Sequence, residues 1–246
     1  PVFNQAMMSA DSALDFLLKA ALGPNKTEVV GLDDALGRIL SEDINSSINV
    51  PGFDNSAMDG YTIALDDNQV SQTNLSFDIV DRITAGSTGN DLKKGCAARI
   101  FTGAPIPKGA NTVIMQEDCN TTDKQIVLKP GIFKEANIRK KGEDIKKGKI
   151  VLSKYDLIRS QEVGLLSSIN KEEIKVLKNI NIAVLSNGNE LVNPGNSKRS
   201  HQIYDSNRFM LMELLNKPFI KLKDCGIIKD DFNEIKNKLF NLKNDY

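Results

Sequence analysis

The stretch INIAVLSNG, residues 180–188, indicates the fold class of the last third of the chain. A mostly apolar run that ends in a polar loop is typical of a buried strand in a parallel sheet. We expect the next strand at Phe219–Leu222 or at Gly226–Ile228. Between them, a helix capped by Ser206 should carry its leucines on one side, at Leu211, Leu214 and Leu215.

A further helix should open at Asp231, because Glu234 follows at the spacing of a capping box. Residues 174–246 therefore predict part of a parallel α/β domain. Two strands and two helices cannot bury a sufficient core alone. We therefore expect the chain to be the front part of something longer, or a truncated form that depends on a partner.

Short alternating apolar runs, broken by Gly, Pro and Asn, fill residues 44–150. Examples are Leu75, Phe77 and Ile79, and the pair Ile126 and Leu128 ahead of a turn at Pro130-Gly131. Period-two runs with frequent turn residues predict a compact β-rich lobe.

Helical segments are expected on both sides of this lobe. Ser12 and Asp15 have capping-box spacing ahead of an apolar stripe, and further helices are expected over Leu32–Ile39 and Tyr155–Ser167. The predicted architecture is multidomain: a helical region at 1–43 and 151–173, an inserted β-rich lobe at 44–150, and an incomplete α/β domain at 174–246.

Composition and charge narrow the class of protein. The chain has 246 residues, of which 40% are hydrophobic and 26% charged, and this excludes a disordered tail, a collagen-like repeat and a disulfide scaffold. Basic and acidic residues balance at 32 each, so no global positive field exists to attract nucleic acid or a membrane. Three cysteines, no long apolar run and no signal-peptide pattern at the start predict a cytoplasmic protein with reduced thiols.

The charges are unevenly distributed along the chain: residues 1–123 carry a net charge of −9, and residues 124–246 carry a net charge of +9. Extra lysines on solvated faces explain most such differences, and head-to-tail pairing of two copies is the alternative.

Four segments rich in Gly, Pro and small polar residues carry acidic or hydroxyl side chains next to turns, at residues 50–61, 100–109, 138–145 and 185–191. Such loops present N–H groups and carboxylates on a rigid support, which suits oxyanions and metal ions. Taken singly, each is also explained as an ordinary turn.

Taken together and in this order, the segments resemble one family, the molybdopterin molybdenumtransferases, which include gephyrin E-domain-like proteins. Residues 51–61, PGFDNSAMDGY, look like the family signature without a mismatch, and residues 102–105 match its TGAP loop. Three more segments resemble its R-x-x-G-E-D-I, I-Y-D-[ST]-N and G-x-x-x-D-D motifs, at residues 139–145, 203–207 and 226–231. The similarity begins at Met8 and runs to the last residue.

Two departures from the family pattern stand out. Residues 186–191 read SNGNEL where family members usually read S-T-G-D-E-L, and the Asn189 amide cannot hold a cation as a carboxylate would. The chain also ends before the family's S-G-G-V-S loop, its later lysines and its C-terminal β domain.

The resemblance implies a reaction in which molybdate reacts with adenylylated molybdopterin, the dithiolene sulfurs capture molybdenum, and AMP is released. Two anionic reactants repel each other, so the site needs cations, and Mg²⁺ held by carboxylates would supply one. The resemblance further implies a homodimer, whose site lies between the β lobe of one subunit and the α/β domain of the other. Molybdopterin adenylyltransferase is the implied pathway partner.

Nine residues carry the site that the resemblance implies. The expected catalytic residues are Asp59, Thr102, Asp144 and Glu190; the expected substrate-binding residues are Ser56, Gly103, Arg139 and Asn207; the expected metal ligands are Asp59 and Asp230.

Structural alternatives stay open for several of them. Asp59 and Thr102 are also suited to stabilising turns. Arg139 is suited to bidentate oxyanion contact or to pairing with Glu143 or Asp144. Glu190 is alternatively a carboxylate at a helix start, and the single histidine, His201, is expected to be a solvated side chain.

Two functions follow from these observations. One is the molybdenum transfer itself, and the alternative is a truncated, non-catalytic relative that acts as a dimerising molybdopterin-binding or scaffolding module. A generic phosphate-binding protein is disfavoured, because the sequence has neither G-x-G-x-x-G after a strand nor G-x-x-x-x-G-K-[ST].

Overall fold

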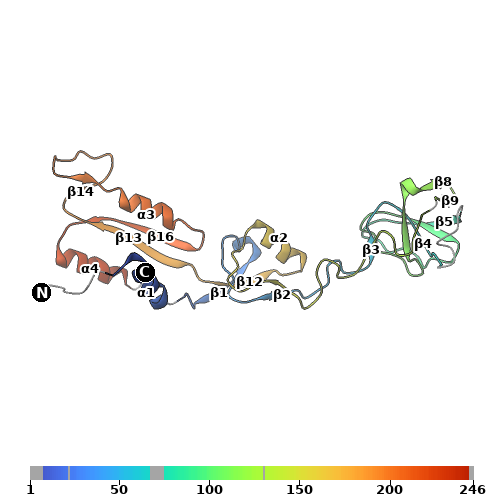
Figure 1. Ribbon diagram of the computed structural model, residues 1–246, viewed down its shortest axis with the longest axis horizontal. Helices are drawn as coiled ribbons and strands as arrows, with labels where there is room; N and C mark the ends of the chain where they lie inside the picture. Colours follow the sequence, from blue (N-terminus) through green and yellow to red (C-terminus); the bar gives the residue numbers. More distant parts are fainter. Residues whose placement is uncertain (1–7, 22, 67–74, 130, 244–246) are drawn as a thin grey trace. The chain divides into compact units, whose positions relative to one another are not determined.

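The computed structural model describes residues 8–21, 23–66, 75–129 and 131–243. Pro130 of the predicted turn and most of the first twelve residues, on which the signal-peptide expectation rests, lie outside this range. The chain divides into two compact units (Figure 1). The first comprises residues 1–43, 153–167 and 171–246, and the second comprises residues 44–152 with 168–170.

The second unit is built on a six-stranded sheet with the strand order β7-β4-β6-β5-β9-β8. Neighbouring strands are antiparallel except for β5 and β6. Its strands are β4 (Gly60–Ile63), β5 (Ser76–Ile83), β6 (Cys96–Ile100), β7 (Thr112–Met115), β8 (Cys119–Thr121) and β9 (Gln125–Leu128). Two short pairs complete the unit: β3 (Asn55–Ser56) with β10 (Ile138–Arg139), and β2 (Ile44–Asn45) with β11 (Ile150–Leu152).

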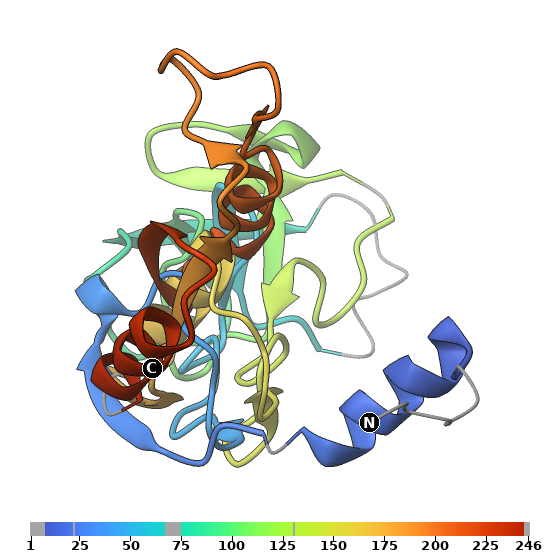
Figure 2. The same ribbon diagram turned by 90° about the vertical axis from the view of Figure 1, so that its left-hand side faces the viewer.

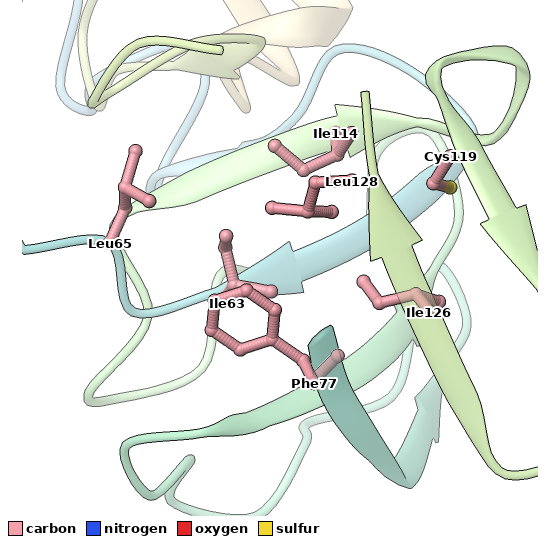
Figure 3. Close-up of a cluster of buried hydrophobic side chains, with 8 residues drawn as sticks. Ile63, Leu65, Phe77, Ile114, Cys119, Ile126 and Leu128 are labelled. Atoms are coloured by element: carbon pink, nitrogen blue, oxygen red, sulfur yellow. The ribbon is translucent and has the colours of Figure 1, made fainter. Parts of the chain in front are cut away.

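Each face of this sheet buries its own apolar cluster, as strand alternation requires. Ile63 and Phe77 belong to the cluster in Figure 3, where Ile126 and Leu128 project from β9. The opposite face buries Ile83, Ile100 and Val113 with their neighbours. The period-two runs that predicted a β-rich lobe are thus strands with one side buried.

The first unit contains a two-stranded parallel pair, β13 (Ile180–Asn187) with β16 (Ile220–Ile228). The strand predicted from residues 180–188 is confirmed, and the two candidates for the next strand are one continuous strand, β16. Helix α3 (Asn207–Leu215) and helix α4 (Phe232–Leu242) lie on opposite sides of the pair (Figures 1 and 2).

The cap predicted at Asp231 is confirmed, because its side chain accepts a hydrogen bond from the backbone of Glu234 at 2.8 Å. Ser206 occupies the N-cap position of α3 but makes no side-chain cap bond. Its neighbour Asp205 accepts from the Arg208 backbone instead, at 3.2 Å. A carboxylate one residue upstream therefore replaces the predicted hydroxyl cap.

The helical region is only partly helical, which corrects the prediction. Helix α1 spans Ala10–Ala20 with Ser9, not Ser12, as its cap, and α2 spans Ser160–Ser168 rather than starting at Tyr155. Two strand pairs also belong to the unit: β1 (Thr27–Gly31) pairs with β12 (Glu173–Leu177), and β14 (Leu191–Val192) pairs with β15 (Ile203–Tyr204).

The helix predicted over Leu32–Ile39 is wrong. Only a 3₁₀ turn forms at Leu32–Asp34, and the backbone of Leu32 donates to the distant Glu172 carbonyl at 3.1 Å. Gly37 then adopts φ +76°, which ends any helical path, and Leu40 bridges to Val176. Backbone hydrogen bonds to residues distant in the sequence therefore form in place of the helix that the local apolar spacing predicts.

Apolar side chains of the α/β part remain exposed. On α4, Phe232 is 77% exposed, and Leu239 and Phe240 are also exposed, while Leu211 and Leu214 of α3 face solvent. Within the described residues, no helix is both long enough and apolar enough to cross a membrane.

We expect Gly60→Ala to destabilise the β lobe severely. An added Cβ would lie 1.8 Å from the Ile114 carbonyl oxygen on the neighbouring strand, so β4 and β7 would have to separate. The loss of unfolding free energy should be about 3 kcal/mol or more, measured by urea denaturation followed by circular dichroism. Gly52→Ala is the control, because its nearest neighbour is a backbone oxygen at 4.0 Å; equal stability of the two variants would contradict the argument.

Candidate functional site

Asp59 and Thr102 meet at one end of the six-stranded sheet. The backbone N–H and the hydroxyl of Thr102 both donate to Oδ1 of Asp59, each at 2.8 Å. The two residues are 43 positions apart, and the antiparallel register of β4 and β6, which places Gly60 opposite Ile100, brings their loops together. Two predicted site residues are therefore in direct contact.

This contact controls the ionisation of Asp59. The backbone hydrogen bond from Thr102, followed by the hydroxyl bond, holds the pKa of the Asp59 carboxyl below its usual value, and the charge of Arg99 adds to the effect. Asp59 is thus an anion at neutral pH. Both bonds use Oδ1, so Oδ2 is the oxygen that Thr102 leaves available.

Ser56 and Gly103 lie beside this pair but are used in local structure. The Ser56 hydroxyl is buried and donates to the Met58 carbonyl at 2.6 Å. The Gly103 backbone N–H donates to the Ser56 carbonyl at 2.8 Å, and Gly103 has φ +81°, a conformation that favours glycine. The structure therefore shows both residues joining the two loops, and a substrate-binding role stays a prediction.

Arg139 forms ion pairs with the two acidic residues that follow it. It binds Asp144 through Nη2, and its Nε lies 3.5 Å from Glu143 Oε1. The Asp144 carboxylate raises the pKa of the Arg139 guanidinium further above its ordinary value. Pairing of β3 with β10 places Arg139 opposite Asn55, so this cluster joins the segment that ends in Asp59. Asp144 is thus paired with Arg139, and the catalytic role expected of Asp144 and the substrate-binding role expected of Arg139 stay predictions.

In the first unit, a polar crevice opens at the carboxyl end of β13. It has a volume of about 390 Å³, and Glu190 and Asn207 are among its lining residues. The other lining residues come from β13, β14, β15 and the start of α3: Leu185, Ser186, Asn187, Leu191, Ile203, Tyr204, Asp205 and Ser206. The carboxyl ends of parallel strands are where open α/β sheets bind ligands.

Asp230 follows β16 and contacts the loop after β13. Its Oδ1 accepts from the Asn187 amide at 3.0 Å, and its Oδ2 accepts from the Asn189 backbone at 3.3 Å. The Asn189 side-chain oxygen in turn accepts from the Asp230 backbone at 3.4 Å. Both asparagines of the SNGNEL segment therefore contact Asp230: Asn187 binds its carboxylate through the side chain, and Asn189 binds its carboxylate through the backbone and its backbone through the side chain.

A buried charge network beneath the crevice was missed by sequence reasoning. Asp205 and Arg208 are only 2% and 4% exposed, and they pair at 2.8 Å. Arg208 also binds Asp224 and donates to Asn193 at 2.5 Å. The available signal was the three-residue spacing of Asp205 and Arg208 at a helix start.

Two protein-family models match this chain. Residues 8–170 match the model described as "MoeA N-terminal region (domain I and II)". The chain belongs to the MoeA family. Residues 183–246 match a second model, described as "Probable molybdopterin binding domain".

Curated relatives of this MoeA-family chain carry an enzyme name. "Molybdopterin molybdenumtransferase" of Haemophilus influenzae is 39% identical over 92% of this chain and 55% of its own length. The protein of the same name from a Nostoc species is 34% identical over 83% of this chain and 48% of its own length. The chain thus spans about half the length of the curated relatives it matches.

Solved structures agree with this membership. A crystal structure titled as the molybdopterin biosynthesis MoeA protein of Pyrococcus horikoshii matches with a TM-score of 0.85 and 32% identity, over 95% of this chain and 63% of that one. A second structure of the Pyrococcus MoeA protein gives a TM-score of 0.82 and 31% identity, over 98% and 62%.

The expected residues of the MoeA-family chain fall into separate contacts. Asp59 pairs with Thr102, and Arg139 with Asp144, in the second unit. Glu190 and Asn207 share the crevice in the first unit. Among the described residues, no three His, Cys, Asp or Glu side chains gather as a metal site.

We expect Thr102→Val to raise the pKa of Asp59 towards its ordinary value. The substitution removes the hydroxyl bond while the backbone bond remains, so the pKa should rise only part of the way. The carboxyl carbon of Asp59, followed by NMR during a pH titration, measures this. Thr84→Val, which removes a hydroxyl bonded to Ser87 in the same unit, should leave the Asp59 titration unchanged.

We expect Asp205→Asn to lower the unfolding free energy by about 3 kcal/mol at pH 7, because it leaves a buried guanidinium with one partner fewer. Burial disfavours the charged form of Asp205, but bonds from Arg208 and Ser186 outweigh it and lower its pKa. Because the pKa of Asp205 is lower in the folded state than in the unfolded state, its ionisation stabilises the fold at pH values above the unfolded-state pKa. This contribution is lost as the pH falls through the folded-state pKa.

The stability difference between wild type and Asp205→Asn should therefore be constant near neutrality and should shrink below about pH 4. Urea denaturation at several pH values measures it, with Asp33→Asn, an exposed aspartate of the same unit, as the control. A difference that grows on acidification would contradict this assignment.

Proposed function

We propose that this chain carries the molybdenum-transfer function of its family: molybdate reacts with adenylylated molybdopterin, the dithiolene sulfurs bind molybdenum, and AMP is released. The observation that carries the proposal is the Asp59–Thr102 contact, because it joins two family segments into one ionised, solvent-exposed group.

The β lobe supplies an anion with a fixed orientation. Thr102 holds Oδ1 of Asp59 through two donors and leaves Oδ2 for a substrate-side partner. In this proposal Asp59 binds a cation or a donor group on the substrate. Arg139, paired with Asp144, is a further guanidinium suited to an oxyanion.

The crevice of the first unit is the proposed pterin-binding region. Its lining is mainly polar, with the Glu190 carboxylate, the Asn207 amide and the Ser206 hydroxyl. Ser206 makes no cap bond in its own helix, so its hydroxyl is available to a ligand. These groups suit a heterocycle that offers several donors and acceptors.

Mg²⁺ is part of the proposal with Asp59 as its ligand. Mg²⁺ is commonly held by one or two carboxylates together with substrate phosphates, which a single free oxygen of Asp59 fits. When bound, it would neutralise phosphate charge. Asp230 fits less well, since both of its oxygens already accept hydrogen bonds from the Asn187 and Asn189 loop.

The remaining proposals concern assembly and context. We propose a homodimer, a cytoplasmic location and molybdopterin adenylyltransferase as the enzyme that supplies the substrate. These rest on the family resemblance, and the opposed charge of the two halves of the chain is compatible with pairing of two copies.

The alternative function is a non-catalytic module that dimerises and binds or scaffolds molybdopterin. The specific observation in its favour is the exposure of apolar side chains on α3 and α4.

The deciding experiment measures AMP released from adenylylated molybdopterin by the purified chain with molybdate and Mg²⁺. Transfer predicts molybdate-dependent AMP, reduced about 100-fold in Asp59→Asn. Asp123→Asn, an exposed aspartate of the same unit, should retain the wild-type rate. A folded chain that binds molybdopterin but releases no AMP would establish the non-catalytic module instead.

A further inference from the structure

Two arginines face each other on the six-stranded sheet without a carboxylate partner. Arg82 on β5 is in register with Arg99 on β6, so like charges lie directly opposite across adjacent strands. Such a pair is destabilising in a sheet. Within the described part of the unit, neither guanidinium forms an ion pair.

Aromatic rings hold both side chains in place. The guanidinium carbons of Arg82 and Arg99 each lie 5.1 Å from the centre of the Phe101 ring. Arg99 also stacks on Tyr61, its cross-strand neighbour on β4, at 4.9 Å. These contacts orient the planar groups while leaving most of their N–H donors unused.

The nearby acidic groups accept hydrogen bonds from donors other than the two guanidiniums. Asp81 accepts from the backbone of Arg82 and from Asn90, at 2.7 and 2.9 Å. Asp59 accepts from Thr102, and Glu117 accepts from the Gln116 amide at 3.0 Å. Arg99 itself donates to the neutral Gln116 side chain at 2.5 Å. The guanidiniums therefore stay available.

The arginine pair adjoins the proposed site. Thr102 directly follows Phe101, and the Gln116 backbone donates to the Asp59 carbonyl at 3.2 Å. Because each guanidinium carbon is 5.1 Å from one ring centre, their separation cannot exceed roughly twice that distance. Because the two residues are also in register on adjacent strands, their guanidiniums belong to one patch that a tetrahedral oxyanion can contact.

We propose that Arg82 and Arg99 form a binding site for a tetrahedral dianion beside Asp59. The chemistry is shared by free molybdate and by a phosphoryl group of the substrate. A dianion between the two guanidiniums would replace their repulsion by attraction. The inference rests on the proposed function for its biological ligand, but the binding site itself is independent of transfer activity.

The test is binding of sodium molybdate, sodium phosphate and glycerol phosphate to the whole chain, by titration calorimetry at constant ionic strength. Binding should weaken about tenfold in Arg82→Gln and in Arg99→Gln, and stay unchanged in Lys124→Gln, an exposed lysine of the same unit. Tighter binding of molybdate would assign the free oxyanion, and equal competition by glycerol phosphate would assign a phosphoryl group.

A second measurement tests whether the two arginines bind an oxyanion or only stabilise the sheet. Without a dianion and at low salt, Arg82→Gln should melt at the same temperature as wild type or above it, because it relieves like-charge repulsion. A lower melting temperature together with unchanged oxyanion binding would overturn the proposal. Neither measurement uses molybdopterin. A chain that failed to release AMP would therefore leave the interpretation of both results unchanged.

Discussion

The pairing of β4 with β6 is the constraint on which the candidate site of the β lobe depends. Gly60 lies opposite Ile100 in this pair, with Asp59 directly before Gly60 and Thr102 two positions after Ile100. The third strand, β7, approaches Gly60 so closely that only a hydrogen fits in place of a side chain. A glycine in the sheet therefore permits the contact that lowers the pKa of Asp59.

Three of the four predicted acidic side chains are held by donor groups of other residues, which lie 43 positions away for Asp59 and Asp230 and five positions away for Asp144. Thr102 holds Asp59, Arg139 holds Asp144, and the Asn187 loop holds Asp230. At Asp59, the two hydrogen bonds from Thr102 favour the charged form and lower the pKa of the carboxyl. They also join loops that follow different strands. The same side chains therefore contribute both to the stability of the fold and to the proposed chemistry.

Burial separates the structural charges from the accessible ones. The Asp205–Arg208 pair is almost fully buried and fixes the start of α3 under the crevice. Asp59 and Arg82 are exposed, so their interactions with the protein cost little to exchange for interactions with a ligand. The exposed groups are for this reason the candidates for binding, whereas the buried pair shapes the crevice.

The sequence by itself determined the elements that depend on local patterns: the alternating strands of the β lobe, the strand at 180–187 and the cap at Asp231. It also determined family membership, through ordered loop motifs. Tertiary structure alone decided that residues 32–39 are not a helix and that Asn187 binds Asp230. These outcomes depend on hydrogen bonds between residues up to about 140 positions apart, such as Leu32 with Glu172, and a local pattern carries no information about such partners.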